Sequence, residues 1–355
     1  QSKGVRLASS RRRFFKRVMI VFAIILIALL ALNIELVRYG LGQAKGQLQI
    51  INDARPIDEV LKDPLFPDSL KKNLRLIDDI KRFAFDSLGI KHSDNYSRVY
   101  DQKGKEIMFV VTACKPYALE PREWSFPLIG TFSYKGFFDR TKAEYLASQL
   151  QSEGLDVNVR TAGGWSTLGW FEDPILSNML ADSEAEFAET IIHELTHGTL
   201  FVKDSVRFNE NLATFVGIKG SERYLATKYG IKSNEVLDYK QLWADRNAVS
   251  RHILRGAQHL DSLYQAMEET MSIAIRQQMK EKAIGKILNE LDTLSISDLK
   301  KYKNYYLKNP PNNTLFMSYL RYRGDFTLLS RELHDRYDGD IKKLLDDYKE
   351  KYPSL

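Results

Sequence analysis

Two histidines stand four residues apart in the stretch ETIIHELTHGTLFVKDSVRFNENLATFVG, which runs from residue 189 to residue 217. If this segment is helical, His193 and His197 lie one turn apart on the same side of it. Ser183, with Glu186 three residues later, has the sequence of a capping box and predicts that a helix begins there. On such a helix, both imidazoles can reach one tetrahedral ion at about 2.0–2.1 Å.

Two glutamates and two asparagines complete the predicted site. Glu194 is expected beside the ion, where it can take a proton from zinc-activated water and pass it to a leaving amine. A second helix is expected from about Phe208, and Glu210 near its start can fold back as the third ligand. Three protein ligands and a water form the open arrangement typical of catalytic zinc. Asn209 and Asn211 flank Glu210 and could orient its carboxylate or a ligand histidine.

Each part of this site also has a plainer interpretation. His193 and His197 could be half-buried, hydrogen-bonded residues of an amphipathic helix, with Glu194 simply solvated. Glu210 could be a surface carboxylate in the turn-like sequence NEN. The combination favours a bound zinc ion, one per chain, because the third candidate ligand follows shortly after the other two.

If the predicted zinc site hydrolyses peptide bonds, the chain also needs groups that hold the peptide substrate. The segment RTAGGWSTLGWFEDPIL precedes the histidine helix, and its glycines allow an extended peptide to approach as an added strand. The candidate substrate-binding residues are Gly163, Gly164, Trp165, Ser166 and Thr167. The tryptophan could equally be a core aromatic. An oxyanion donor is expected opposite the catalytic glutamate, and the candidates are Tyr319, Tyr322, His252 and His259.

The N-terminal segment predicts a membrane anchor. Residues 18–32 form an unbroken apolar run that follows six clustered cations. Extending the run to residue 37 gives a helix long enough for a hydrocarbon core of about 30 Å. The basic residues favour an N-terminus in the cytoplasm and the bulk of the chain outside it. A cleaved signal peptide is the alternative, although no small-residue cleavage site follows the run.

Charge and cysteine content exclude several other classes. The net charge is +6, but without the N-terminal cations the chain is close to neutral, which argues against nucleic acid as a partner. Cys114 is the only cysteine, so neither an intramolecular disulfide nor a thiolate zinc cage can form.

The pattern along the chain predicts an α+β fold, with a small sheet and helices followed by a mostly helical half. Strands are expected at residues 107–113, 128–134 and 155–160, with a helix at 142–152. The predicted segments are a cytoplasmic basic region (1–17), a transmembrane helix (18–37), a stalk (38–66) and a zinc-metallopeptidase-like domain (67–355), with a sheet-bearing half (67–182) and a helical half (183–355).

Four blocks of the sequence, in this order, resemble the bacterial putative aminopeptidase family, which comprises zinc metallopeptidases of the gluzincin type in Gram-negative envelopes. The blocks are LEPREWSFPLIGTFSYKGFFD, STLGWFEDPILSNML, AETIIHELTHGTLFVKDSVRFNENLATFVG and NNTLFMSYLRYRGDF. The resemblance covers about residues 40–345. It implies that His193, His197 and Glu210 bind zinc, that Glu194 is the catalytic acid/base and that Tyr322 stabilises the oxyanion.

Two departures from the family pattern matter. The chain lacks the cysteine that would follow the apolar run in a lipoprotein, which favours an uncleaved helix. It also lacks a recognisable motif for the amino group of a substrate, so aminopeptidase action is implied by the resemblance alone.

The sequence therefore predicts a zinc peptidase, of aminopeptidase type, anchored in the bacterial inner membrane with its catalytic domain in the periplasm. The expected partners are peptide or protein substrates, the membrane and proteins of a membrane complex. Endopeptidase action remains an alternative, as does a non-catalytic subunit of an envelope assembly that retains a metallopeptidase fold.

Overall fold

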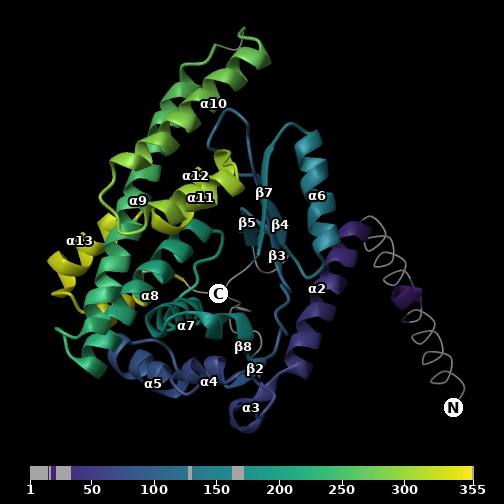
Figure 1. Cartoon of the computed structure of the whole chain (residues 1–355). Helices are drawn as coiled ribbons and strands as arrows, with labels where there is room; N and C mark the ends of the chain where they lie inside the picture. Colours follow the sequence, from purple (N-terminus) through teal and green to yellow (C-terminus); the bar gives the residue numbers. More distant parts are fainter. Residues whose placement is uncertain are drawn as a thin grey trace, which may run out of the picture. The chain divides into compact units, whose positions relative to one another are not determined.

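The computed structural model describes residue 15 and residues 17–20, 33–126, 130–161, 172–268 and 270–353. These residues are mostly helical, with three small sheets (Figure 1). The chain divides into two compact units, residues 1–52 and residues 53–355. Helix α2 (Ile34–Asp53) makes up most of the described part of the first unit. The candidate site lies in the second unit.

The structure contradicts the prediction of a transmembrane helix. Among the described residues, no helix combines the length and the apolarity needed to cross a membrane. In α2 polar and charged side chains such as Arg38, Gln43 and Lys45 interrupt the apolar residues. Residues 21–32 of the predicted anchor lie outside the described part of the chain. A fold class with an N-terminal transmembrane helix is not retained, and neither is the single-pass inner-membrane location that depended on it.

The sheets are smaller than the α+β prediction implied, since no described strand is longer than six residues. The first sheet has the order β1–β2–β8, with β2 antiparallel to β1 and parallel to β8. The second is antiparallel, in the order β6–β3–β7, and the third pairs β4 with β5. Their bounds are β1 (Arg55–Pro56), β2 (Arg98–Tyr100), β3 (Phe109–Cys114), β4 (Trp124–Phe126), β5 (Gly130–Phe132), β6 (Lys135–Phe137), β7 (Asp156–Thr161) and β8 (Ile175–Leu176).

Two of the predicted strands correspond closely to strands of the structure. The strand expected at 107–113 is β3, and the one expected at 155–160 is β7. Of the strand expected at 128–134, residues 130–132 form β5, while 127–129 lie outside the described residues. The domain boundaries drawn from the sequence stay a prediction.

The helices of the second unit follow the polar caps and apolar spacing of the sequence. Seven of them are preceded by a Ser, Asp or Asn whose side chain accepts a hydrogen bond from the first turn, among them Ser183 and Asn312. The bounds are α3 (Ile57–Lys62), α4 (Asp68–Leu74), α5 (Ile77–Leu88), α6 (Arg140–Ser152), α7 (Glu184–Thr199), α8 (Val206–Tyr229), α9 (Asn234–Gln265), α10 (Ile273–Asn289), α11 (Leu299–Lys308), α12 (Asn313–Arg323), α13 (Phe326–Tyr337) and α14 (Ile341–Lys351), with 3-10 turns η1 (Ser177–Ala181) and η2 (Glu290–Thr293).

Two apolar clusters hold these helices together. The larger surrounds α7, which packs against both α8 and α5 (Figure 1). It includes Phe187 and Ile191 of α7 and Phe215 of α8, which are completely buried. The second lies between α9, α10 and α12 and includes Ile253 and Phe316. Burial of one such side chain stabilises the fold by about 1.5–3 kcal/mol, so α7 is among the most firmly held elements.

A buried ion pair fixes the start of α12. Lys280 of α10 donates to both carboxylate oxygens of Asp156, at 2.7 and 2.6 Å, and its side chain is only 4% exposed. The same carboxylate accepts a hydrogen bond from the backbone N–H of Asn313, at 2.8 Å. Three segments that are distant in the sequence thus meet at Asp156.

We expect Lys280→Ala to lower the free energy of unfolding by about 3–5 kcal/mol, because it leaves the carboxylate of Asp156 buried without its cation. The matched control is Lys286→Ala in the same helix, where an exposed pair with Glu290 at 3.8 Å should contribute less than about 1 kcal/mol. Urea unfolding of both variants measures the difference. Equal small losses would show that the buried pair does not fix α12.

Candidate metal centre

Helix α7 carries the two histidines, and its start is fixed by the predicted cap. The Ser183 hydroxyl accepts from the backbone N–H of Glu186 at 3.3 Å and donates to its carboxylate at 2.7 Å. Asn73 of α4 holds the preceding loop, since its amide donates to the carbonyls of Leu180 and Asp182. The capping-box prediction is confirmed, and the helix runs without interruption through both histidines.

Helix α8 approaches α7 closely because glycine stands at the contact. A Cβ at Gly217 would lie 2.8 Å from the carbonyl oxygen of Glu189 and 3.2 Å from the Cβ of His193. A Cβ at Gly220 would lie 2.8 Å from a methyl carbon of Leu88. Any larger residue at Gly217 would push the backbone of α8 away from the face that carries the histidines.

The ligand atoms of His193, His197 and Glu210 meet between these helices. The two Nε2 atoms are 3.1 Å apart, and one carboxylate oxygen of Glu210 lies 3.5 Å from each. The imidazole rings are nearly perpendicular, at 86°. All three side chains are largely buried, with exposed fractions of 18%, 7% and 10%. The three candidate ligands predicted from the sequence are therefore brought to one point.

These distances fit a single metal ion. Bonds of about 2.0–2.1 Å in a tetrahedral arrangement place neighbouring ligand atoms about 3.3–3.4 Å apart. The observed separations of 3.1, 3.5 and 3.5 Å bracket that value. In His197, Nδ1 is buried without a hydrogen-bond partner among the described residues, so Nε2 is the nitrogen that faces polar groups. The cluster can hold a metal ion.

The electrostatics of the cluster favour positive charge at its centre. Burial alone would raise the pKa of the Glu210 carboxyl, but hydrogen bonds with His193 and His197 hold that pKa well below its usual range. Burial works to lower the pKa of the His197 imidazole, but the contact with Glu210 outweighs burial and raises that pKa. Glu194 is half-buried, and burial raises the pKa of its carboxyl despite the nearby histidines. A cation between the three ligands matches this charge distribution.

The asparagines beside Glu210 organise the backbone around the cluster. The Asn209 amide exchanges two hydrogen bonds with the backbone of Val202, at 2.9 and 2.8 Å, which holds the loop between α7 and α8. The Asn211 amide donates to the carbonyl of Arg321 at 2.6 Å and accepts from the N–H of Asp325 at 2.9 Å. Both side chains therefore bind backbone groups, and the sequence-based role of orienting a ligand directly stays a prediction.

Tyr322 lies close to the cluster. The backbone carbonyl of Arg321, the residue before Tyr322, accepts a hydrogen bond from the amide of Asn211, the residue after Glu210. Helix α12 therefore meets α8 next to the third candidate ligand. Burial raises the pKa of the Tyr322 hydroxyl, and the carboxylates of Glu210 and Glu194 raise it further. Its oxygen accepts a hydrogen bond from Nη2 of Arg160 at 3.1 Å, so its own proton can be donated elsewhere.

Strand β7 aligns α12 with the cluster. Asp156 binds the first residue of the helix, and Arg160, four residues along the same face of the strand, binds Tyr322. The four steps from Asp156 to Arg160 along the strand advance about 13 Å, and the nine steps from Asn313 to Tyr322 along the helix advance about 13.5 Å. Strand and helix are therefore matched in length between the two contacts, which fixes Tyr322 along the helix axis.

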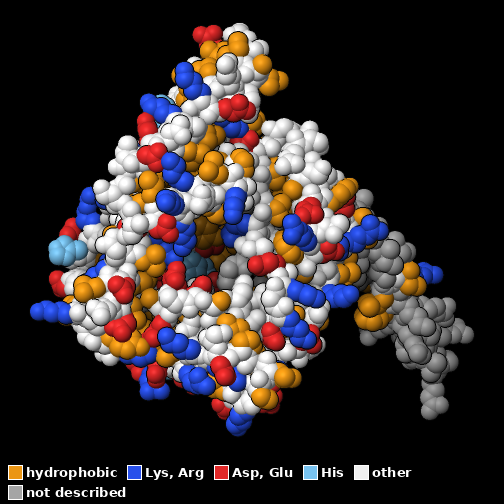
Figure 2. Space-filling view, in the orientation of Figure 1, with side chains coloured by type: hydrophobic (Ala, Val, Ile, Leu, Met, Phe, Trp, Pro, Cys, Tyr) orange, Lys and Arg blue, Asp and Glu red, His pale blue; other side chains and the backbone are white. Residues whose placement is uncertain are grey.

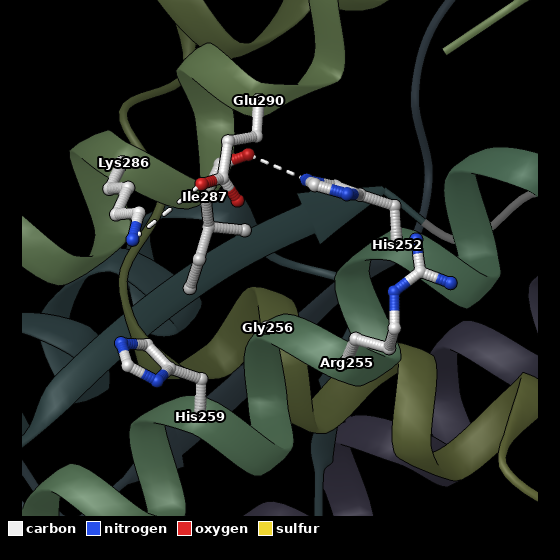
Figure 3. A pocket seen from close by; sticks show the side chains of 7 residues that line it. All are labelled: His252, Arg255, Gly256, His259, Lys286, Ile287 and Glu290. Atoms are coloured by element: carbon white, nitrogen blue, oxygen red, sulfur yellow. Dashed lines mark hydrogen bonds and ion pairs between the residues drawn. The ribbon is translucent and has the colours of Figure 1, made fainter. Parts of the chain in front are cut away.

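The other sequence-based candidates are not at the cluster or are not described. The predicted substrate-binding residues Gly163, Gly164, Trp165, Ser166 and Thr167 lie outside the described residues. His252 and His259 line a separate hollow between α9 and α10, where His252 Nε2 lies 2.6 Å from the carbonyl of Ile287 (Figure 3). The Tyr319 hydroxyl pairs with that of Tyr306 at 3.2 Å. Tyr322 is thus the candidate oxyanion donor that the structure brings near the cluster.

Two further residues near the site were not among the candidates predicted from the sequence. Arg160 and Tyr134 belong to the sheet-bearing segment. Burial works to lower the pKa of the Arg160 guanidinium, but the Tyr322 hydroxyl and then the charge of Glu210 outweigh it and raise that pKa. Burial raises the pKa of the Tyr134 hydroxyl, and the charge of Glu210 raises it further. A lone arginine in a strand has no local pattern that marks it. In the orientation of Figure 1, Figure 2 shows a hollow in the region of α7 and α8, with histidine (pale blue) at its floor and Lys or Arg side chains (blue) around it.

Two histidines from one helix, a carboxylate from the next and a glutamate between the histidines form the type of site on which metal-dependent hydrolases are built. The chain belongs to the family described as Putative aminopeptidase, whose model matches residues 38–351. This confirms the predicted family, suggests peptidase activity and implies peptide substrates, while the gluzincin subclass stays a prediction. No curated protein and no solved structure matches the chain.

We expect Gly217→Ala to weaken metal binding and to lower the free energy of unfolding by about 1–3 kcal/mol, because the new methyl group forces α8 away from His193. Gly285→Ala in α10 is the control, since a Cβ there meets nothing within 4 Å and should stabilise the helix by about 0.5–1 kcal/mol. Zinc titration and thermal unfolding of both variants compare them. If the two variants behave alike, the close approach of α7 and α8 does not control the cluster.

Proposed function

We propose that this protein is a zinc-dependent peptidase in which His193, His197 and Glu210 hold the ion and Glu194 is the general base. The observation that carries the proposal is the set of three ligand-atom separations, 3.1, 3.5 and 3.5 Å, with Glu194 next to a ligand on the same helix. A site that only stabilises the fold does not need a carboxylate beside the ion. The family description supports release of residues from the N-terminus of a peptide.

A zinc ion held in this cluster supplies a Lewis acid that makes water nucleophilic near neutral pH and polarises the carbonyl of the scissile bond. Glu194 accepts the proton that the attacking water loses and returns it to the leaving amine. Tyr322 donates its hydroxyl proton in a hydrogen bond to the carbonyl oxygen as negative charge develops there. Arg160 supports this donation, because it binds the tyrosine oxygen and leaves its proton free.

The first test separates metal binding from chemistry. Glu194→Gln should keep one zinc per chain but lower the rate of peptide hydrolysis by about 10²–10⁴-fold, since only the base is lost. Glu235→Gln, an exposed carboxylate at the start of α9, is the control and should change neither quantity. Metal content by mass spectrometry and cleavage of a mixed peptide library give both readouts. The positions of the cuts distinguish removal of N-terminal residues from internal cleavage.

Three outcomes are informative. Zinc in wild type and variant, with cleavage in wild type alone, supports the proposal. Zinc in both and cleavage in neither contradicts it and favours a non-catalytic member of a protein assembly. A well-folded wild type that binds no zinc overturns the metal site.

A second test addresses the ligands. His193→Gln should weaken zinc binding by more than the roughly 10–100-fold typical of losing a group that only supports a ligand. His334→Gln in α13 is the matched control, since this histidine is exposed and not part of the cluster. Competition with a zinc chelator measures both affinities. If the two variants bind zinc equally well, His193 is not a ligand.

A further inference from the structure

Arg160 is a cation that forms no direct ion pair with a described residue, although the more distant carboxylate of Glu210 stabilises its charge. Its guanidinium is half-buried, and no carboxylate among the described residues lies within ion-pair distance of it. Its hydrogen bonds in the described part of the chain are Nη2 to the Tyr322 hydroxyl, at 3.1 Å, and a long contact of Nη1 to the Thr161 carbonyl, at 3.5 Å. The following segment, residues 162–171, contains no acidic residue in its sequence. A guanidinium offers five N–H donors, and most of those of Arg160 have no partner among the described residues.

A half-buried guanidinium without a direct ion pair gains from an anion that joins it. Removing a charged group from water without pairing it is unfavourable, and a structural role would be better served by an uncharged side chain. Lys280, a buried cation that contacts the same strand, has a direct carboxylate partner, namely Asp156. Arg160 has no such partner among the described residues, so its fork is open to a group that is not part of the chain.

The position of Arg160 limits the kind of anion that it can bind. It binds Tyr322, which lies on α12 where this helix meets α8 next to Glu210. An extended peptide advances about 3.3–3.6 Å per residue. An anion held by Arg160 therefore lies within one or two residues of a peptide bond placed between Tyr322 and the metal cluster. The planar fork of arginine matches the two oxygens of a carboxylate.

We propose that Arg160 is a specificity-determining residue that binds a carboxylate of the peptide substrate, one or two residues from the scissile bond. The inference rests on the proposed peptidase function and deepens it, because it defines the substrates as peptides with a negative charge at that position. The carboxylate can come from the C-terminus of a short peptide or from an Asp or Glu side chain. Hydrolysis breaks the same amide bond in either case, and the carboxylate takes no part in the proton transfers.

Binding without turnover tests the inference directly. The zinc-loaded Glu194→Gln protein is titrated by calorimetry with trialanine as the free acid and as the C-terminal amide. A second pair of probes, alanyl-glutamyl-alanine amide and alanyl-glutaminyl-alanine amide, places the charge on a side chain. We expect at least one carboxylate probe to bind about tenfold or more tightly than its neutral partner. The pair that shows the difference identifies the source of the carboxylate.

Replacement of the arginine should remove this preference. Arg160→Gln in the same background should bind charged and neutral probes within about twofold of each other. Arg160→Lys should keep part of the preference, because it retains the charge but loses the two-pronged geometry. Thermal unfolding and zinc content confirm that both proteins are folded. If every protein binds charged and neutral probes alike, or if Arg160→Gln keeps the preference, the inference is overturned.

A role in positioning Tyr322 alone predicts a different result. In that case Arg160→Gln would lower hydrolysis of the acid and the amide by the same factor, and it would leave their binding ratio unchanged. The test also separates the two proposals. Arg160-dependent binding with no hydrolysis by wild type contradicts the peptidase proposal but not the carboxylate site. Glu194-dependent hydrolysis with no charge preference contradicts only the carboxylate site.

Discussion

The candidate site depends on how closely two helices approach each other. At Gly217, where a side chain would collide with the backbone of α7, the helices come near enough for Glu210 to reach both imidazoles. Two imidazoles and a carboxylate are costly to remove from water, so the surrounding core has to offset them. Phe187, Ile191 and Phe215, which are fully buried on the same two helices, supply that apolar contact. Packing and polar chemistry thus share one interface.

A second layer is added by a helix that is distant in the sequence. Asp156 and Arg160 project from one face of β7 and contact α12 near both of its ends. Asn211 ties the last turn of α12 to α8, one residue beyond Glu210. Tyr322 is consequently held from a strand and a helix at once. This geometry separates the groups into two sets, with the candidate metal ligands on α7 and α8 and the proposed substrate-contacting groups, Arg160 and Tyr322, on β7 and α12.

Features with a local spacing were predictable, and features that depend on long-range contacts were not. Histidines four residues apart and the Ser183 cap have physical signatures within one helix, and the structure agrees with both. Arg160 has no such signature, because its partner is 162 residues away in the sequence. The apolar run at 18–32 predicted a membrane span by composition alone, whereas the described residues contain no helix that could cross a membrane. At the C-terminal end of the strand predicted at residues 128–134, β5 stops at Phe132, since pairing partners rather than propensity limit a strand.

Synthesis of the chain from its N-terminus determines when the candidate site can be complete. The candidate metal ligands are complete once residue 210 has been synthesised, but Tyr322 on α12 comes more than a hundred residues later. Closing a loop of that length is entropically unfavourable until its contacts form, and domains fold as the chain emerges. An unfinished chain therefore carries the ligands without the groups on α12. Under the proposed function, the site is incomplete until α12 has been synthesised and has packed against α8 and β7.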